Sequence, residues 1–350
     1  MTATATIDLA AYRANLAHVR DRIRPARLMA VIKGDAYGHG LDRMAAAAAE
    51  AGVDLLGVLD SATALAVRKA GIDVQLFAWL FAADEDFTPL VDQRIDVGIS
   101  TMVELERVAA ATTRGTAGRV HLKIDTGLHR NGASAEDWPA FVRRAVELEE
   151  SGLIVLEGVW THIGEASDED DSDAIARFGR AVEQARGLGA DPSVSHLAAS
   201  AAGLARADAR FDVVRVGAFT YGIAPGSGIG PRDLGLIPVM TLTAEVTVVS
   251  AGRGGSIAVV DAGYLDGIPA GAAGRVRAAV RGARHPITAV RPTATDLLVV
   301  GEVEVGDRVT FFGAGTEGEE TLQEWADALD TIGEEIVVRI PQSVPRHYVG

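Results

Sequence analysis

Eight short apolar runs recur along the first two thirds of the chain, with stretches of helical periodicity between most of them. Most runs are nearly continuous in apolar character, as strands buried on both faces require. The strands predicted from them are residues 28–33, 54–59, 74–79, 95–99, 120–125, 154–162, 193–197 and 212–217. Helices are predicted over 41–51, 61–70, 102–112, 135–150 and 170–188, with Ser61 and Ser134 as N-caps. Strands and helices in this alternation predict a (β/α)8 TIM barrel of the α/β class.

The pattern changes after Pro225. Residues 226–231 are rich in glycine and predict a linker. Beyond it, strands are predicted at 240–250, 256–260, 275–280, 296–300, 308–312 and 335–340, with one helix at 321–329. The predicted domains are therefore a barrel over residues 1–225 and a smaller, mostly β domain over residues 226–350. The first few residues of the chain are expected to pair with the C-terminal domain.

Composition limits the classes of function. Apolar residues make up 48% of the 350 residues and charged residues 23%, which suits a large core and argues against disorder. The formal net charge of -15 disfavours nucleic acid and anionic membranes as partners, although a site can still be locally positive. The absence of cysteine excludes disulfides and thiolate metal sites. No secretory signal and no apolar run of about 18 residues is visible, so we expect a cytoplasmic protein.

Two blocks carry the candidate chemistry. Lys33 ends the first apolar run and is followed by a glycine-rich turn that holds Tyr37. Loss of solvating water at the end of a buried strand would disfavour the ammonium form of Lys33 and make its amine a nucleophile for an aldehyde. The second block, about 230 residues later, presents Tyr264 between Gly263 and Gly267 in a predicted tight turn. An amine and a phenol are suited to act on opposite faces of one carbon.

Barrel enzymes place their chemistry at the carboxyl ends of the strands. Each such side chain alone is compatible with a structural polar group, but their collection on one rim favours a site. The titratable side chains at or near predicted strand ends are Lys33, Lys123, Asp125, His162, His196 and Arg215. Ser200 and the backbone of Gly217 and Ala218 follow the last strands, where barrels commonly bind phosphate. A reactive lysine beside a phosphate site predicts pyridoxal 5'-phosphate. No metal is expected, because the neighbouring cations would repel one.

These blocks resemble the alanine racemase family, in unbroken order from about Ile7 to the C-terminus. The matching segments are 31–40 (VIKGDAYGHG), 121–132 (HLKIDTGLHRNG), 161–162 (TH), 195–202 (SHLAASAA), 214–217 (VRVG), 221–222 (YG), 263–267 (GYLDG) and 344–346 (VPR). The resemblance implies a barrel followed by a β domain and binding of pyridoxal phosphate. It also implies a homodimer in which each active site borrows a tyrosine from the other subunit.

The resemblance assigns roles to four catalytic residues. Lys33 would bind the aldehyde of the cofactor and act as the base on one face of the substrate. Tyr264 of the partner subunit would be the base on the other face. Arg215 would hydrogen-bond the pyridine nitrogen, and His162 would bridge Arg215 and the tyrosine.

Cofactor and substrate residues are implied in the same way. Tyr37, Ser200 and the backbone of Gly217 and Ala218 would hold the phosphate, and Tyr221 belongs to the same cofactor-binding set. Lys123 matches a lysine that is often carbamylated in the family. Arg130 would neutralise the substrate carboxylate and the phenolate oxygen of the cofactor.

The substrate side departs from the family pattern. Ala294 and Thr295 stand where the family usually has a Met-Asp pair that lines the substrate entrance, and Ala199 replaces an asparagine. The sequence therefore predicts a racemase that uses two bases and acts on an amino acid other than, or larger than, alanine. Two alternatives stay open: an aldolase, decarboxylase or transferase on the same scaffold, and a non-catalytic protein that binds the cofactor.

Overall fold

The computed structural model describes residues 2–112, 115–226 and 228–350, so Ser227 of the predicted linker and Met1 lie outside the described residues. The chain forms two compact units. The barrel unit comprises residues 19–33 and 48–217, and the sheet unit comprises residues up to 18, 34–47 and 218–350. The chain passes from one unit to the other four times: after His18, Lys33, Ala47 and Gly217.

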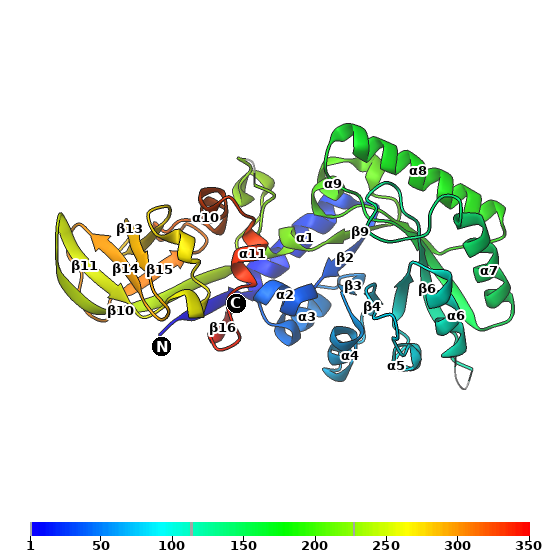
Figure 1. The fold of residues 1–350 in the computed structure, drawn as a ribbon, viewed down its shortest axis with the longest axis horizontal. Helices are drawn as coiled ribbons and strands as arrows, with labels where there is room; N and C mark the ends of the chain where they lie inside the picture. The colour runs from blue at the N-terminus through cyan, green and yellow to red at the C-terminus, as the bar shows by residue number, and fades with distance from the viewer. Residues whose placement is uncertain (1, 113–114, 227) are drawn as a thin grey trace. The chain divides into compact units, whose positions relative to one another are not determined.

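Eight parallel strands form the barrel unit, as predicted (Figure 1). Their order is β8-β7-β6-β5-β4-β3-β2-β9, and the Asp212 amide closes the ring by donating to the Ser195 carbonyl at 3.0 Å. The strands are β2 (Arg27–Val31), β3 (Leu55–Val58), β4 (Gln75–Ala78), β5 (Asp96–Ile99), β6 (Gly118–Lys123), β7 (Ile154–Trp160), β8 (Val194–His196) and β9 (Val213–Val216). All eight predicted strands are confirmed, each within a few residues at its ends.

Helices connect the strands along their outer side (Figure 1). They are α4 (Ser61–Lys69), α5 (Thr88–Asp92), α6 (Met102–Ala110), α7 (Trp138–Glu150), α8 (Asp168–Gly187) and α9 (Ser200–Ala205). Both predicted N-caps are wrong. Asp60 caps α4 instead of Ser61, because its extended backbone lets the carboxylate accept from the Thr63 amide at 2.8 Å. Ser134 closes a turn onto the Asp137 amide, and α7 begins only afterwards.

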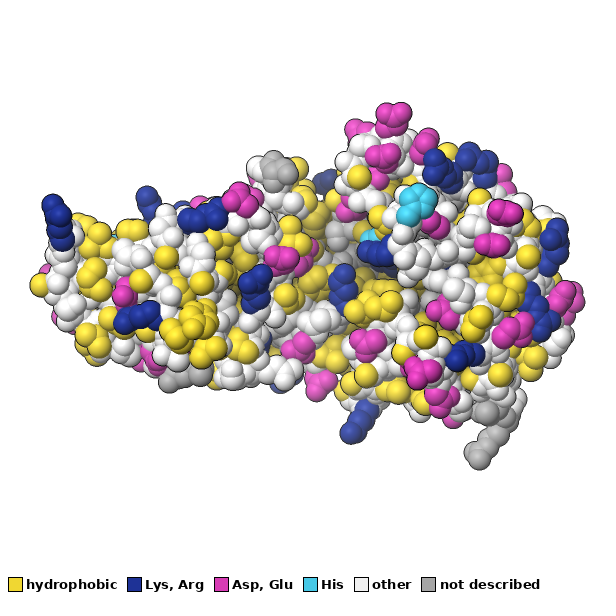
Figure 2. Space-filling view, in the orientation of Figure 1, with side chains coloured by type: hydrophobic (Ala, Val, Ile, Leu, Met, Phe, Trp, Pro, Cys, Tyr) yellow, Lys and Arg dark blue, Asp and Glu magenta, His cyan; other side chains and the backbone are white. Residues whose placement is uncertain are grey.

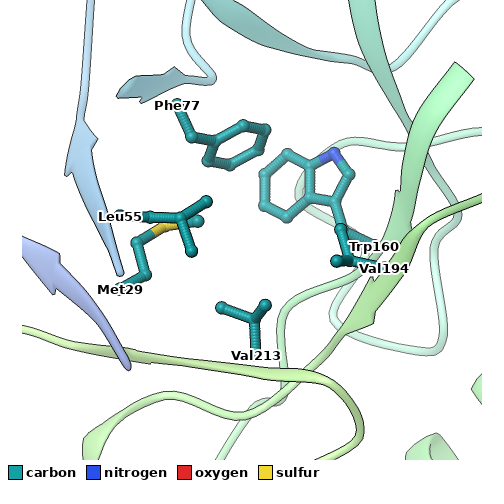
Figure 3. Close-up of a cluster of buried hydrophobic side chains, with 6 residues drawn as sticks. All are labelled: Met29, Leu55, Phe77, Trp160, Val194 and Val213. Carbon is teal, nitrogen blue, oxygen red and sulfur yellow. The ribbon is translucent and has the colours of Figure 1, made fainter. Parts of the chain in front are cut away.

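A layer of large side chains fills the barrel interior (Figure 3). It comprises Met29, Leu55, Phe77, Trp160, Val194 and Val213, each from a different strand. Phe77 and Trp160 meet edge to face, with ring centroids 5.2 Å apart. Such a layer makes the barrel interior a packed core, so functional side chains can reach a ligand only at the strand ends.

The sheet unit is built on a mostly antiparallel sheet with strand order β11-β14-β13-β12-β15-β10-β1-β16, in which β1 and β16 pair in parallel. The strands are β1 (Thr4–Asp8), β10 (Met240–Gly252), β11 (Gly255–Val260), β12 (Arg277–Val280), β13 (Ala283–Val290), β14 (Thr295–Val299), β15 (Arg308–Phe312) and β16 (Arg346–Val349). β1 pairs with β10 and with β16, so the start of the chain lies in this sheet. Two helices at the junctions of the units, α1 (Leu9–Ile23) and α3 (Leu41–Glu50), have residues in both units.

Three elements of the sheet unit, α11 (Gly333–Val337), β13 and β16, differ from the sequence prediction. The strand predicted at 335–340 is wrong, because helix α11 begins there with Glu334 and Glu335 in its first turn, where carboxylates favour a helix. α10 (Leu322–Leu329) is capped by Thr321, in line with the helix predicted at 321–329. β13 and β16 were missed; Pro286 within β13 argues against a strand in sequence terms.

The surface mixes both charges. On the face shown in Figure 2, acidic and basic side chains are interspersed rather than gathered into one field. Within the described residues, no helix has the length and apolar character needed to cross a membrane.

Candidate active site

Lys33 follows β2 at the carboxyl end of the barrel, where the Ile32 amide donates to the Gly57 carbonyl at 2.9 Å. Its side chain is exposed, so the expectation that Lys33 is desolvated by burial is wrong. The desolvated lysine is Lys123, the last residue of β6, which is only 3% exposed. The difference arises because the strand ends two residues before Lys33, so that this lysine stands on the rim.

The backbone after Lys33 turns in the left-handed sense. Gly34, Asp35, Ala36 and Tyr37 have φ between 53° and 62°, a conformation that costs about 1–2 kcal/mol for each residue with a side chain. Asp35 offsets part of that cost, because its carboxylate accepts from the Leu41 amide at 2.8 Å and starts α3. Such strain persists where the surrounding structure holds it and is often found at functional sites.

Tyr37 is buried by this turn within the sheet unit. Its ring lies 4.9 Å from that of Tyr221, which in turn stacks on Tyr12 at 5.3 Å. Burial raises the pKa of Tyr37, with Glu334 adding to the rise, and burial also raises the pKa of Tyr221. Both phenols therefore stay protonated and can donate a hydrogen bond, which suits the predicted binding of an anionic group by Tyr37.

Lys123 lies in the barrel unit against the indole ring of Trp160, its Nζ 4.2 Å from the ring centroid. It donates a short hydrogen bond to the side-chain oxygen of Asn131. Burial, followed by the charges of Arg215 and Arg130, lowers the pKa of Lys123 to about 7. Trp160 and Asn131 were not among the predicted site residues, although both lie within or next to the strand ends that hold the others.

Arg215 is a buried cation with neutral partners. Its Nη1 donates to Nδ1 of His196, and its Nη2 lies 2.9 Å from Nδ1 of His162. The remaining bonds go to the carbonyls of Thr161 and Leu197, at 2.9 and 3.0 Å. Burial lowers the pKa of Arg215 to about 9, with Arg130 contributing. A guanidinium held this way favours an electron-rich group beside it.

The pKa of His162 reflects the positive charge at this rim of the barrel unit. Its pKa falls to about 2, first because it is buried and then because of Arg215, Arg130, Lys123 and Lys33 in turn. The ring is therefore neutral at physiological pH. The structure thus brings five predicted site residues of the barrel unit together, in the predicted grouping of a lysine, a histidine and an arginine at the strand ends.

Ser200 and Gly217 also meet in the barrel unit. Ser200 begins α9, and its Oγ accepts a hydrogen bond from the Gly217 amide at 3.3 Å. A carboxylate not foreseen from the sequence lies nearby: Glu165 accepts from the Ala202 amide at 2.8 Å, and burial raises its pKa. Ala218 continues the chain into the sheet unit, where its carbonyl accepts from the Ile223 amide.

Tyr264 stands on a short turn of the sheet unit, with 48% of its surface exposed. Its amide donates to the Arg291 carbonyl at 2.9 Å, and the buried Asp266 carboxylate accepts from the Gly263 amide at 2.8 Å. A Cβ at Gly263 would come within 2.2 Å of the same Arg291 carbonyl. Only glycine fits there, so the turn is held rigidly while the phenol projects outward.

Ala294 and Thr295 lie in the segment that holds this turn. The Ala294 carbonyl accepts from the Arg291 amide, and a Cβ at Gly263 would also touch the Ala294 amide, at 2.6 Å. Thr295 is fully buried, and its hydroxyl donates to the Ala262 carbonyl at 2.7 Å. This bond turns the Thr295 hydroxyl into the sheet unit, away from the role of a substrate ligand.

These residues fit pyridoxal phosphate. Four cations surround His162 in a chain of net charge -15, so an anionic group would offset a local excess of positive charge. Arg215 offers donors that meet only neutral acceptors, and Lys33 is an exposed amine at the strand end.

The family models match both parts of the chain. The alanine racemase N-terminal domain matches residues 7–225 and the alanine racemase C-terminal domain matches residues 245–348. The alanine racemase of Thermobifida fusca is 40% identical, covering 99% of this chain and 98% of its own. That of Frankia casuarinae is 41% identical, covering 99% of this chain and 96% of its own.

Solved structures agree. An alanine racemase from Streptomyces lavendulae, a producer of D-cycloserine, matches with a TM-score of 0.96 and 36% identity over 100% of this chain and 97% of that one. The Streptomyces coelicolor alanine racemase gives a TM-score of 0.95 and 38% identity over 100% and 98%. None of these relatives supports the predicted preference for an amino acid other than alanine. The chain belongs to the alanine racemase family of pyridoxal-phosphate-dependent amino-acid racemases.

Proposed function

We propose that this chain racemises a small amino acid with two bases, Lys33 and the partner subunit's Tyr264: one removes the α-proton and the other returns a proton to the opposite face. The observation that carries the proposal is the set of four cations around the neutral His162 on the rim of the barrel unit. Such a rim suits a phosphate, a phenolate and a substrate carboxylate at once. When bound, pyridoxal phosphate delocalises the negative charge left at Cα.

The chain's own residues supply the remaining steps. Lys33 removes or returns the proton on one face, and the phenol of Tyr264 does so on the other. Arg215 donates to the pyridine nitrogen, and His162, whose Nδ1 already accepts from Arg215, presents its other nitrogen to the tyrosine. Tyr37, Ser200, Gly217 and Ala218 hold the phosphate, with Tyr221 packed behind Tyr37. Arg130 and Lys123 face the substrate carboxylate.

Alanine is the first candidate substrate, because the relatives named above are alanine racemases. A larger amino acid is the second candidate, favoured by one observation. Ala294 is small, and the Thr295 hydroxyl is already bonded to the Ala262 carbonyl, so neither side chain closes the substrate entrance as a Met-Asp pair would. Loss of circular dichroism from a panel of L-amino acids decides between them. If the entrance is wide, A294M shifts the preference toward alanine.

Attachment of the cofactor is tested by borohydride reduction of the holoenzyme followed by peptide mapping. The chain has only three lysines, Lys33, Lys69 and Lys123, so the outcome is unambiguous. We expect the label on Lys33. A label on Lys69 or Lys123 contradicts the assignment.

We also propose that two copies share their sites and that the functional domains are residues 1–225 and 226–350. The exposure of Tyr264 and its neighbour Leu265, at 48% and 60%, supports the shared site. Mixing inactive K33A with inactive Y264F tests it. A mixed dimer keeps one site with both residues and regains activity if sites are shared. Mixtures that stay inactive contradict the shared site.

A further inference from the structure

The buried imidazoles of the barrel unit form one chain of hydrogen bonds between a carboxylate and a guanidinium. Asp96, the first residue of β5, is fully buried, and its Oδ2 lies 3.3 Å from Nε2 of His121. Nδ1 of His121 lies 3.0 Å from Nε2 of His196. Nδ1 of His196 lies 2.9 Å from Nη1 of Arg215. Every nitrogen of both rings is therefore engaged inside the barrel.

The proton positions along this chain follow from Arg215, which can only donate. Nδ1 of His196 must accept, so the proton of the neutral ring sits on Nε2 and is donated to His121. Nδ1 of His121 then accepts, its proton sits on Nε2, and Asp96 receives it. Any other arrangement sets one N–H group against another or leaves a contact without a proton. The N–H groups all point from the cation toward the anion.

Packing leaves the rings no freedom to turn. A Cβ at Gly158 would lie 2.4 Å from Nδ1 of His121, so the ring fills the space that this glycine leaves. The indole of Trp160 stacks on His196 at 5.7 Å with an angle of 15° between the rings. Because the rings are fixed, only the placement of the protons can adapt to a change at either end of the chain.

Asp96 is held as a carboxylate by further donors. Arg119 Nε donates to Oδ1 and Gln75 donates to Oδ2, each at 2.5 Å, and Arg119 also pairs with Glu157 at 2.6 Å. Burial acts to raise the pKa of Asp96, but hydrogen bonds from His121 and Arg119 outweigh it and lower the pKa. Of the other cations, Lys123 and Arg27 add to the lowering of the pKa of His196, which keeps that ring neutral.

We propose that Asp96 is a positioning residue for racemisation: from β5 it fixes the protons on His121 and His196, so that Arg215 meets an acceptor and keeps its place. The proposal rests on the proposed role of Arg215 in holding the cofactor. Asp96 acts through His121, His196 and Arg215 and touches neither substrate nor cofactor itself.

The test is the proton position on each ring, measured by 15N–1H correlation spectra of histidine-labelled holoenzyme. In the wild-type protein we expect the proton of His196 on Nε2. In D96N, Arg119 selects the amide oxygen, and Gln75 turns its own amide oxygen toward the new NH2 group. One N–H of that group then faces His121 and donates to Nε2. The proton of His196 then moves to Nδ1, opposite Arg215. His162 keeps its proton on Nε2 in both proteins, because its Nδ1 accepts from Arg215.

E157Q is the matched control, because Glu157 pairs with the same Arg119 but touches no imidazole of the chain. It should leave the spectra and the turnover number unchanged, whereas D96N should lose turnover as the proton of His196 moves from Nε2 to Nδ1. A wild-type His196 with its proton on Nδ1 overturns the proposal even if D96N does not fold. Moved protons with full turnover overturn the positioning role. If the wild-type protein racemises nothing, the proposed function fails, but the spectra still decide the proton positions.

Discussion

The ammonium group of Lys123 lies over the ring of Trp160, with Nζ 4.2 Å from the centroid. The guanidinium carbon of Arg215 lies 5.3 Å from the same ring. Burial, Arg215 and Arg130, in that order, bring the pKa of Lys123 to about 7, so this lysine gives up its proton easily. The guanidinium of Arg215 stays charged, so Lys123 is the group of this pair that loses its proton as the pH rises above about 7.

Lys123 should therefore react with carbon dioxide at pH 8. A neutral amine adds carbon dioxide and loses a proton to form a carbamate. The carbamate is an anion, and the positive charges of Arg130 and Arg215 beside it favour its formation. With 13C-labelled bicarbonate, we expect one carbamate signal in the NMR spectrum of the holoenzyme. K123R should abolish it, and K69R, which changes an exposed lysine, should retain it. A signal that survives K123R contradicts this prediction.

The neutral state of His162 depends on its neighbours. Burial lowers its pKa to about 2, and Arg215 is the largest of the charges that add to the effect. We therefore expect the 13C signals of His162 to stay constant from pH 8 to pH 5. In R215Q the pKa should rise toward the reference value of about 6.5, because the glutamine brings no charge. Titration of the wild-type ring near 6.5, as in the denatured chain, would show that the cations are screened.

Four histidines with a lowered pKa should make the fold sensitive to acid. Burial lowers the pKa of His39 to about 4 and of His162 to about 2, and it lowers the pKa of His196 well below its usual value and that of His285 as well. In the unfolded chain each ring binds a proton below about pH 6.5, whereas in the folded protein the ring stays neutral until a lower pH. The unfolded state therefore binds more protons than the folded state in this range. Stability is therefore complete above pH 6.5 and falls as the pH is lowered.

The slope can be measured by urea denaturation between pH 4.5 and 7. Four protons correspond to a loss of at most about 5 kcal/mol per pH unit. His39 donates from Nδ1 to the backbone carbonyl of Tyr37 at 2.8 Å, a bond that the amide of H39Q can replace. H39Q should thus remove one proton, about 1.4 kcal/mol per pH unit, from the slope. An unchanged slope would mean that His39 is already charged in the folded protein.

The sequence predicted the barrel well for a physical reason. Its strands are buried on both faces, so their apolar runs are unbroken and their ends are marked by polar residues such as Lys123 and His162. The interior chain that supports Arg215 was missed. Asp96 and His121 lie within predicted strands, but a single polar residue in an apolar run does not indicate which strand will face it across the barrel.

The predictions failed where local chemistry competes with burial. The segment around Ile336 and Ile340 is apolar enough for a strand, yet the two acidic residues before it favour a helix start. Likewise, Lys33 ends an apolar run in the sequence, but the backbone leaves the strand before reaching it. The left-handed turn that follows has no signal beyond its glycines, because Asp35, Ala36 and Tyr37 rarely adopt a positive φ.

That turn offers a matched pair of substitutions. Gly34 and Gly38 have φ of 62° and 75°, so alanine at either position carries the left-handed penalty of about 1–2 kcal/mol. A Cβ at Gly34 meets nothing within 4 Å, whereas one at Gly38 would lie 2.7 Å from the Val337 carbonyl oxygen. The Gly38 carbonyl also accepts hydrogen bonds from Nε and Nη2 of Arg346, both at 3.1 Å. These bonds oppose a shift of the turn away from Val337.

G34A should therefore lower the free energy of unfolding by about 1–2 kcal/mol, and G38A by about 3 kcal/mol or more, since overpacking adds to the backbone penalty. Chemical denaturation of both variants beside the wild-type protein gives the comparison. Equal losses would mean that the segment around Val337 yields and that the turn is held by its backbone conformation alone. A larger loss in G38A shows that contacts with Val337 and Arg346 hold the turn that follows Lys33 in place.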